Sequence, residues 1–477
     1  MSNLSELLPT GGGQNAVDFV ASGTLSSGQT VVLKTDGTVT AISASANPPV
    51  VGTGVVFDDG VSYSNCVYDS INNKVVIAYA DSSPSPFGRA VVGTVSGTSI
   101  SFGTPVAFNS GSTSYIGCAF DVNSGKIVIS YTNGANSNYG TSRVGTISGT
   151  SISFGTPAVF QSAYCLFNSV VYEPSAQKTV TLYRNIGNAS YGTAIVGTVS
   201  GTSISFGTSA VFNSTTTNYP FGVYDSSSQK IIISYQNNGN SSYGTAIIGT
   251  VSGTSISFGS AVVFNSGFTA RSSSAYDTEN NKTVIAFADS NNPFVGKAIV
   301  GTVSGTSISF GSATVFTDQY DFNSIAYDSN NKNLLLIYRN VSNASKGEYR
   351  IGTVSGTNVT FGSSAVFQDS AISYTASVYD STAQKVVIAY TATDGTAKVF
   401  STGGTNSADF IGITAEAISD TATGAVNVYG GINEAQTGLT IGSDYYVQDD
   451  GSLSTTASDV KVGQAISATT INMMDLT

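Results

Sequence analysis

The sequence predicts an all-β protein built mainly from one repeated unit. The stretch V-S-G-T-S-I-S-F-G at residues 95–103 recurs nearly unchanged four more times and once more loosely. A second marker, an aromatic residue followed by an acid, occurs seven times, with five steps of 52 residues and one of 51. A period near fifty residues with several short strands per unit is typical of a β-propeller. We therefore predict a seven-bladed β-propeller at residues 49–402, plus a small β-domain made from both ends of the chain.

Each unit is expected to form four strands, as the second copy illustrates. Residues 115–120 form an apolar, small-residue pattern, and residues 126–131 are rich in β-branched side chains. A third strand ends at residues 144–147, and a fourth runs from 151 to 160 after the tight turn at 148–150. Tight turns join antiparallel neighbours, so the four strands should form one sheet, the blade, in chain order.

The two ends of the repeat region complement each other. Residues 50–57 align with the fourth strands of the other units, but no first, second or third strand precedes them. The last unit has strands ending at Tyr379, Tyr390 and Phe400, and no fourth strand follows. We therefore predict that strand 50–57 is the outermost strand of the last blade, which closes the ring without open edges.

The segments outside the repeats are predicted to form one discontinuous β-domain, residues 1–48 with 403–477. Each carries a β-hairpin around an Asp-Gly pair, at Asp36-Gly37 and at Asp450-Gly451. In both segments a Leu-x-x-Gly sequence precedes the hairpin at the same spacing. Residues 1–14 have a short apolar stretch and a triple glycine, so they are either a disordered terminus or a docking arm.

Composition limits the partners. The 477 residues are 40% hydrophobic and only 10% charged, with a net charge of −11 and a pI near 4.4. This acidity argues against nucleic acid and anionic membrane surfaces as partners. The chain has no apolar run of about eighteen residues and no secretory pattern at its start, so we expect no membrane insertion and synthesis in the cytoplasm.

The side-chain inventory predicts no catalytic residues, no metal and no cofactor. The chain lacks histidine and has three scattered cysteines, which excludes the usual triads and zinc ligand sets. The repeated acids are expected to cap turns through backbone amides rather than to react. We therefore predict that the protein is not an enzyme. A glycan-degrading hydrolase stays open as an alternative, since a glycosidase needs only two suitably spaced carboxylates.

The loops at one face differ between repeats, whereas the Ser-Gly-Thr turns and the acid-capped turns at the other face hardly vary. Recognition is expected on the varied face, where aromatic side chains lie beside amides and could stack on and hydrogen-bond to sugar rings. Packing of these side chains onto their own blade is the alternative. The candidate ligand-binding residues are Phe87, Tyr139, Tyr191, Tyr243, Asn133, Asn185, Asn237, Tyr115, Tyr219 and Tyr320.

Four stretches of the two termini, residues 7–15, 20–25, 438–451 and 465–470, carry a resemblance to a known family. They resemble virion structural proteins of tailed bacteriophages, the tail-fibre-like proteins, while the repeats resemble YVTN-type propeller units. It implies a virion protein that docks on other virion proteins through its terminal domain. The expected role is a tail-fibre or tail-tip adhesin that presents the varied face to host-surface glycan. A capsid or tail decoration protein without a receptor role is the alternative, and the oligomeric state stays open.

Overall fold

The computed structural model describes residues 15–34, 36–43, 48–81, 87–289, 294–403, 407–448, 450–458 and 460–474. The predicted docking arm, residues 1–14, lies outside them. The chain divides into two compact units, Val50–Thr402 and the pair of segments Met1–Pro49 and Gly403–Thr477. Both units are built from antiparallel strands, and the helical segments among the described residues are all short 3-10 turns. None of the described helical turns is long and apolar enough to cross a membrane.

The larger unit repeats one antiparallel pattern, which repeat 2 illustrates. Its first strand, β11 (Thr113–Asp121), pairs with β12 (Lys126–Asn133), and β12 pairs with β13 (Tyr139–Ser148). The third strand β13 then pairs with β14 (Ser151–Phe154) and with the first residues of β15 (Ala158–Glu173). The expected fourth strand is therefore two segments on one partner, separated by a bend at Gly155.

The remaining strands follow the same order, with a long strand where the fourth strand of one repeat continues into the first strand of the next. Repeat 1 contains β6 (Val61–Asp69), β7 (Lys74–Asp81), β8 (Phe87–Ser96), β9 (Ser99–Phe102) and β10 (Val106–Asn109). Repeats 3 and 4 contain β15, β16 (Lys178–Asn185), β17 (Tyr191–Ser200), β18 (Ser203–Phe206), β19 (Ala210–Asp225), β20 (Lys230–Asn237), β21 (Tyr243–Ser252) and β22 (Ser255–Phe258). Repeat 5 contains β23 (Val262–Asp277), β24 (Lys282–Asp289), β25 (Val295–Ser304), β26 (Ser307–Phe310) and β27 (Thr314–Thr317). Repeat 6 contains β28 (Tyr320–Asp328), β29 (Asn333–Asn340), β30 (Lys346–Ser355), β31 (Asn358–Phe361) and β32 (Ala365–Ala371).

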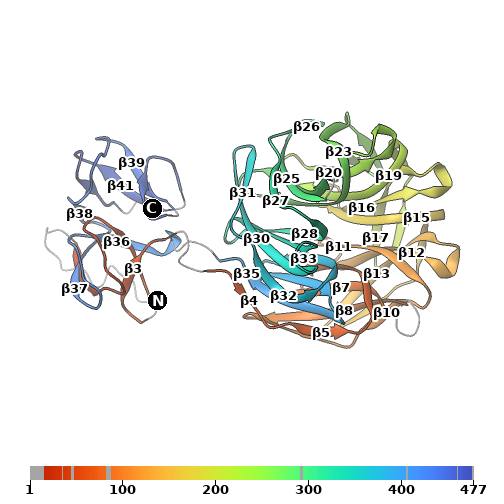
Figure 1. Cartoon of the computed structure of the whole chain (residues 1–477), viewed down its shortest axis with the longest axis horizontal. Coiled ribbons are helices and arrows are strands. Elements are labelled where there is room, and N and C mark those ends of the chain that lie inside the picture. The colour runs from red at the N-terminus through yellow and green to blue at the C-terminus, as the bar shows by residue number, and fades with distance from the viewer. Residues whose placement is uncertain are drawn as a thin grey trace. The chain divides into compact units, whose positions relative to one another are not determined.

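Repeat 7 combines the two ends of the larger unit. Its first three strands are β33 (Ser373–Asp380), β34 (Lys385–Thr391) and β35 (Gly395–Ser401). The third strand β35 pairs antiparallel with β4 (Val50–Val51) and β5 (Val55–Asp58). In Figure 1 these N-terminal strands, in orange-red, lie beside the blue β35. The first strands also contact one another in series, from β6 through β11, β15, β19, β23 and β28 to β33, and β33 contacts β6.

The second strands form the most deeply buried layer. In repeat 4, residues Ile231, Ile232 and Ile233 are fully buried, and Tyr235 is 1% exposed. A strand buried on both faces needs an unbroken apolar run, as these β-branched side chains provide. The turn before each second strand is held by the predicted acid: Asp225 accepts the backbone N–H groups of Ser227 and Ser228 at 2.9 and 3.1 Å. The other six repeats have the same contact, which confirms the structural assignment of these acids.

Adjacent repeats meet through a glycine and a turn. A Cβ added to Gly207 would lie 1.9 Å from the carbonyl oxygen of Thr254, in the Ser-Gly-Thr turn of the next repeat. Gly52 makes the same approach to Thr98 of repeat 1, also at 1.9 Å. This contact requires glycine in the first position, and it accounts for the recurrence of both sequence elements at six of the seven junctions.

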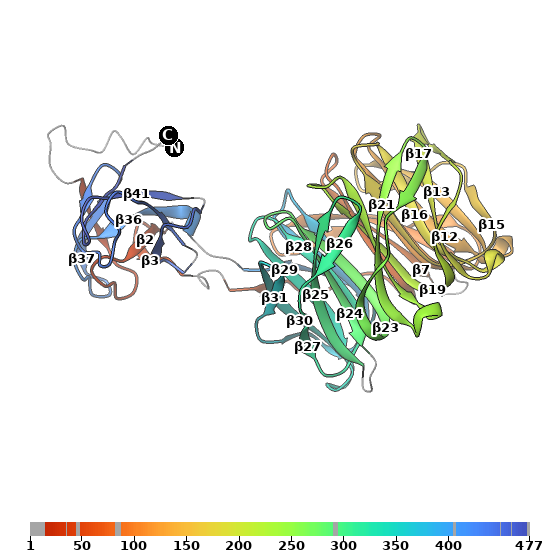
Figure 2. The ribbon, with the colours of Figure 1, turned by 90° about the horizontal axis from the view of Figure 1, so that it is seen from above.

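The smaller unit consists of two five-stranded sheets to which both ends of the chain contribute. One sheet has the order β1 (Ala16–Val20), β37 (Thr423–Val428), β36 (Phe410–Thr414), β2 (Thr30–Leu33) and β3 (Val39–Ala41). The other has the order β38 (Ile432–Asn433), β42 (Ile471–Asn472), β41 (Lys461–Ala465), β39 (Asp444–Val447) and β40 (Leu453–Ser454), and the short turn η5 (Ser407–Asp409) precedes β36. Figure 2 shows red N-terminal strands among the blue C-terminal ones in this unit.

Two details confirm the likeness of the hairpins in the smaller unit. Asp36 accepts the backbone N–H of Thr38, and Asp450 accepts that of Ser452. Gly37 and Gly451, which follow the two acids, have φ angles of 83° and 82°, in the left-handed region where glycine is favoured. Their strands pair as predicted, β2 with β3 and β39 with β40.

Candidate functional site

Each first strand of the larger unit is interrupted by a β-bulge at its start. In repeat 2 the pairing with β12 shifts between Ser114 and Gly117, and Tyr115 at the bulge has a φ of 49°. Equivalent residues in all seven repeats have φ between 42° and 55°, although none is glycine. We call them the collar: Tyr63, Tyr115, Phe167, Tyr219, Arg271, Phe322 and Tyr374. Positive φ is costly for bulky residues, and such strain gathers at functional sites.

The collar residues contact one another from repeat to repeat. The ring centroids of Tyr63 and Tyr115 are 5.1 Å apart, those of Tyr115 and Phe167 5.0 Å, and those of Phe167 and Tyr219 4.7 Å. Tyr374 lies 5.2 Å from Phe322 and 5.3 Å from Tyr63, so the contacts pass from the last repeat to the first. These tilted contacts of half-buried rings are favourable aromatic geometry. They link the six aromatic side chains of the collar, of which Phe167, Tyr219, Phe322 and Tyr374 line the cavity described next.

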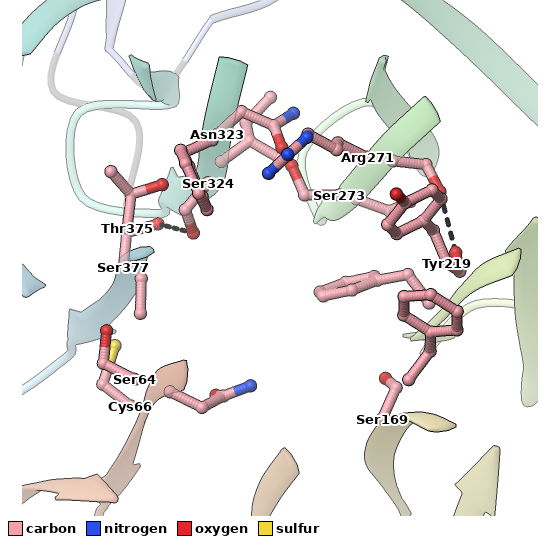
Figure 3. A pocket seen from close by; sticks show the side chains of 18 of the residues that line it. Ser64, Cys66, Ser169, Tyr219, Arg271, Ser273, Asn323, Ser324, Thr375 and Ser377 are labelled. Carbon is pink, nitrogen blue, oxygen red and sulfur yellow. Dashed lines mark hydrogen bonds between the residues drawn. The ribbon is translucent and has the colours of Figure 1, made fainter. Parts of the chain in front are cut away.

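A cavity of about 420 Å³ lies inside the collar. Its wall is formed by five collar residues, by the three residues after the bulge in six repeats and by Cys118 of repeat 2. Most of the residues after the bulges are Ser, Asn, Thr or small apolar residues. Figure 3 shows Ser169, Ser273, Asn323 and Thr375 arranged around this central opening together with Arg271. Three buried polar atoms of the wall have no hydrogen-bond partner among the described residues: Asn168 Oδ1, Ser273 Oγ and Thr375 Oγ1. Because unpaired buried polar atoms are costly, these atoms favour a polar occupant.

Arg271 is the one charged residue of this wall and the one collar position without an aromatic ring. Its guanidinium carbon lies 4.3 Å from the centroid of Phe322, where it takes the place of a stacked ring. Its Nε forms an ion pair of 2.5 Å with Asp321, which precedes Phe322 in the chain. Arg339 also pairs with Asp321, at 3.0 Å, and lies 5.1 Å from the Phe322 ring.

Tyr63 and Tyr115 of the collar keep their protons at neutral pH. Burial raises the pKa of Tyr115 to about 12, with a further contribution from Tyr63 and other tyrosines nearby. Burial likewise raises the pKa of Tyr63, and the charge that Tyr374 would carry adds to the effect. Their hydroxyls therefore offer neutral hydrogen-bond donors and acceptors at the rim. The described residues contain no cluster of three potential metal-ligating side chains.

Of the ten predicted ligand-binding residues, two lie in the collar. Tyr115 and Tyr219 are half-buried and contact Phe167 from either side. Tyr320 lies behind the collar: it is 2% exposed, its hydroxyl donates to the carbonyl oxygen of Arg271 at 3.3 Å, and its ring packs on Phe316.

Four other predicted aromatics begin the third strands, away from the cavity wall. Phe87, Tyr139, Tyr191 and Tyr243 are half-buried, and Tyr139 is paired with Tyr164 of the following strand. Their assignment as ligand-binding residues stays a prediction.

The predicted amides end the second strands and have partners within their own loops. Asn133 accepts a hydrogen bond from Asn109 at 3.3 Å, and Asn237 accepts one from Thr215 at 2.7 Å. The Oδ1 atom of Asn185 is buried without a partner among the described residues. Two repeats have aspartate at this position, and each pairs with a base on the neighbouring strand: Asp81 with Arg89 at 3.0 Å and Asp289 with Lys297 at 2.6 Å.

Sequence reasoning missed Phe167, Arg271 and Phe322. In the loop before Phe322 it selected Tyr320 instead. Counting the repeat period from Tyr63 would have found the collar, because its members recur at steps of 52 residues and once of 51. The bulge shifts these residues out of simple alternation, so the pattern of apolar positions does not reveal them.

No family model and no curated protein matches the chain. Among solved structures, it is similar to a lectin from Burkholderia pseudomallei, with a TM-score of 0.55 and 10% identity over 74% of this chain and 98% of the lectin. It also matches a periplasmic gluconolactonase from Pseudomonas aeruginosa, with a TM-score of 0.47 and 10% identity over 75% and 97% of the two chains. The likeness to the lectin shows a shared propeller-like, antiparallel all-β fold and nothing further.

One prediction is corrected by these matches. The chain was predicted not to be an enzyme, yet a gluconolactonase is among the proteins that it resembles in fold. At 10% identity the match assigns no reaction to this chain.

Proposed function

We propose that the larger unit is a seven-bladed β-propeller closed by β4 and β5. The pairing of β35 with both N-terminal strands supports closure, as does the contact of β33 with β6. The approach of Gly52 to Thr98 repeats the junction found between the other repeats, such as Gly207 with Thr254. In this arrangement the collar surrounds the mouth of the central channel.

The proposed activity of the collar is binding of host-surface glycan. The observation that carries the proposal is the set of seven non-glycine residues held at positive φ, of which four aromatic residues and Arg271 line a polar cavity. Sugar rings bind by stacking of their C–H faces on aromatic rings and by hydrogen bonds from their hydroxyls. The tyrosine hydroxyls and the Ser, Asn and Thr side chains of the cavity wall supply the polar groups.

The proposed setting is the surface of a phage particle, where the protein docks on other virion proteins through its smaller unit. The resemblance of both termini to tail-fibre-like proteins supports this setting, and both termini belong to that unit. The lectin match is compatible with the glycan-binding role, because a protein of the same fold carries that name. The second candidate, a decoration protein of capsid or tail, rests on the same termini and needs no ligand.

The test is binding of the full-length chain to surface polysaccharide purified from a host strain, measured by isothermal titration calorimetry. Replacement of Tyr219 by Ala removes one collar ring and should weaken binding about tenfold, a typical loss for one stacked aromatic anchor. The matched control is Tyr224→Ala, which removes a half-buried tyrosine of the same strand β19 from outside the cavity wall and should bind as the wild type does. Equal losses in the two variants would contradict the collar as the site.

Two further outcomes separate the candidates. Absence of binding by the wild-type chain, with the collar covered by another virion protein in electron cryomicroscopy of the particle, would leave the decoration role. Release of oligosaccharides from the polysaccharide would reveal a hydrolase.

A further inference from the structure

Two arginines share one carboxylate at the edge of the collar. Asp321 pairs through Oδ1 with Nε of Arg271 at 2.5 Å and through Oδ2 with Arg339 at 3.0 Å. Neither distance leaves room for water between the partners, so both pairs are direct. One carboxylate neutralises one of the two guanidiniums, and the group keeps a surplus of one positive charge.

The terminal nitrogens of Arg271 are the free part of this group. Its Nε is held by Asp321 and its plane lies on Phe322, which fixes the side chain. Within the described ranges, Nη1 and Nη2 of Arg271 form no hydrogen bond or ion pair, and the side chain is 35% exposed. Arg339 differs, since its Nη1 donates to the carbonyl oxygen of Ile372 at 3.5 Å. A fixed guanidinium with two free N–H edges is suited to a carboxylate.

A hollow of about 330 Å³ adjoins this group and lies outside the central cavity. Arg271 and Arg339 line it together with Tyr320, Gln319 and Phe294. Phe294 is 48% exposed, which leaves a ring face open to a ligand. The volume is in the range of small-ligand sites. Because Arg271 lines both the hollow and the central cavity, a ligand here would continue into the collar.

We propose that this hollow binds a carboxylate-bearing sugar, so that the glycan bound by the protein is an acidic polysaccharide. The uronate carboxylate lies on the free edge of Arg271, and the sugar ring lies against Phe294. The inference rests on the proposed glycan-binding function and adds the chemical class of the ligand. A net charge of −11 opposes binding of anionic polymers in general, so a local surplus of positive charge is required for it.

The experiment uses polygalacturonate as the probe and its fully methyl-esterified form as the neutral match. Binding of the full-length chain to each polymer is measured by calorimetry at low salt. We expect the wild type to bind the acid form roughly tenfold tighter than the ester, the difference expected from one charge-assisted pair. The preference should shrink as salt rises, because exposed charge pairs are screened.

Arg271→Tyr gives the collar the side chain that four other repeats have there, and so removes the charge while keeping a ring. It should lower affinity for the acid form to that of the ester. Arg339→Gln leaves the collar itself intact and lets Asp321 neutralise Arg271, so it should reduce the acid preference in the same way. Lys230→Gln is the control, since it removes one positive charge beside an acid-capped turn and outside the hollow. It should leave the preference for the acid form unchanged.

The outcomes are distinguishable. Equal binding of the two polymers by the wild type, or an acid preference that survives both Arg271→Tyr and Arg339→Gln, would overturn this inference and leave the proposed function standing. No binding of either polymer or of the host polysaccharide would refute the proposed function and this inference with it.

Discussion

The junction between repeats gives the sharpest prediction, because the chain contains both the test position and its control. A Cβ on Gly52 would lie 1.9 Å from the carbonyl oxygen of Thr98, whereas a Cβ on Gly362 would have only the carbonyl oxygen of Ile351 nearby, at 3.8 Å. The two glycines occupy equivalent places in their repeats. Gly362 has no partner turn because repeat 7 lacks the Ser-Gly-Thr hairpin between its third and fourth strands.

Gly52→Ala should therefore destabilise the larger unit far more than Gly362→Ala. To reach an ordinary contact near 3.4 Å, the Cβ and the Thr98 oxygen must separate by about 1.5 Å, and a backbone carbonyl cannot rotate away as a side chain can. We expect a loss of about 3 kcal/mol for Gly52→Ala, the upper end for overpacking, and a change within about 0.5 kcal/mol for Gly362→Ala.

The assay is urea unfolding of the full-length chain, followed by tyrosine fluorescence and by circular dichroism. A loss of about 3 kcal/mol should also lower the melting temperature by roughly 4 °C in a unit of about 350 residues. Gly207→Ala, at an internal junction with the same 1.9 Å approach, should match Gly52→Ala. If Gly52→Ala were neutral, or if Gly362→Ala cost as much, the N-terminal strands would not pack as the structure places them.

Three further predictions concern charge and buried hydrogen bonds. Burial raises the pKa of Asp225, but hydrogen bonds, with those from Ser228 the largest, outweigh burial and hold the pKa below its ordinary value. The stabilisation of the fold by this carboxylate is therefore complete well above pH 4 and is lost as the pH falls through the folded pKa. Urea midpoints should fall in acid, and they should fall less in Asp225→Asn. The ion pair of Asp289 and Lys297 stands where several other repeats have Asn and Thr. The double variant Asp289→Asn with Lys297→Thr should therefore leave the free energy of unfolding nearly unchanged, while Asp289→Asn alone should lower it by about 1–2 kcal/mol. A double-mutant cycle that shows no coupling between the two residues would contradict this. Asn433 is fully buried and donates a hydrogen bond to the carbonyl oxygen of Thr414 at 3.0 Å. Asn433→Ala should therefore destabilise the smaller unit by about 2 kcal/mol. In thermal unfolding, the transition of the smaller unit should move to lower temperature, while that of the larger unit stays in place.

The repeats were enough to predict the strands and the acid-capped turns of the larger unit, and the Asp-Gly pairs were enough to predict the two terminal hairpins. These features depend on local sequence: alternation of apolar residues, a capping acid such as Asp225, and the Asp-Gly pairs at residues 36–37 and 450–451. The division of the fourth strand at Gly155 was not predicted, since it depends on a contact with the next repeat.

The candidate site was predicted less well than the fold. The varied loops led to Tyr115 and Tyr219, but the collar depends on a bulge that adds residues to one strand of a pair, and the sequence of a single repeat contains no marker for it. Asn133, Asn185 and Asn237 at the ends of the second strands were predicted to bind a ligand. Two repeats have Asp at this position, and there Arg89 and Lys297 replace threonine on the neighbouring strand; the strand register has to be known before these positions can be compared.

The bulge that creates the collar also separates ligand chemistry from scaffold chemistry. Each collar side chain leaves the sheet at a single left-handed residue, so a different side chain there need not disturb the strand pairs on either side. Arg271 shows that such an exchange is accepted at one position, among rings at the other six. Seven codons, spaced almost evenly along the gene, can therefore change one at a time. The number of possible collars grows as the product of the side chains accepted at each of the seven positions. A protein with this architecture could follow a drifting target surface through point mutations alone, without insertions and without rebuilding its core.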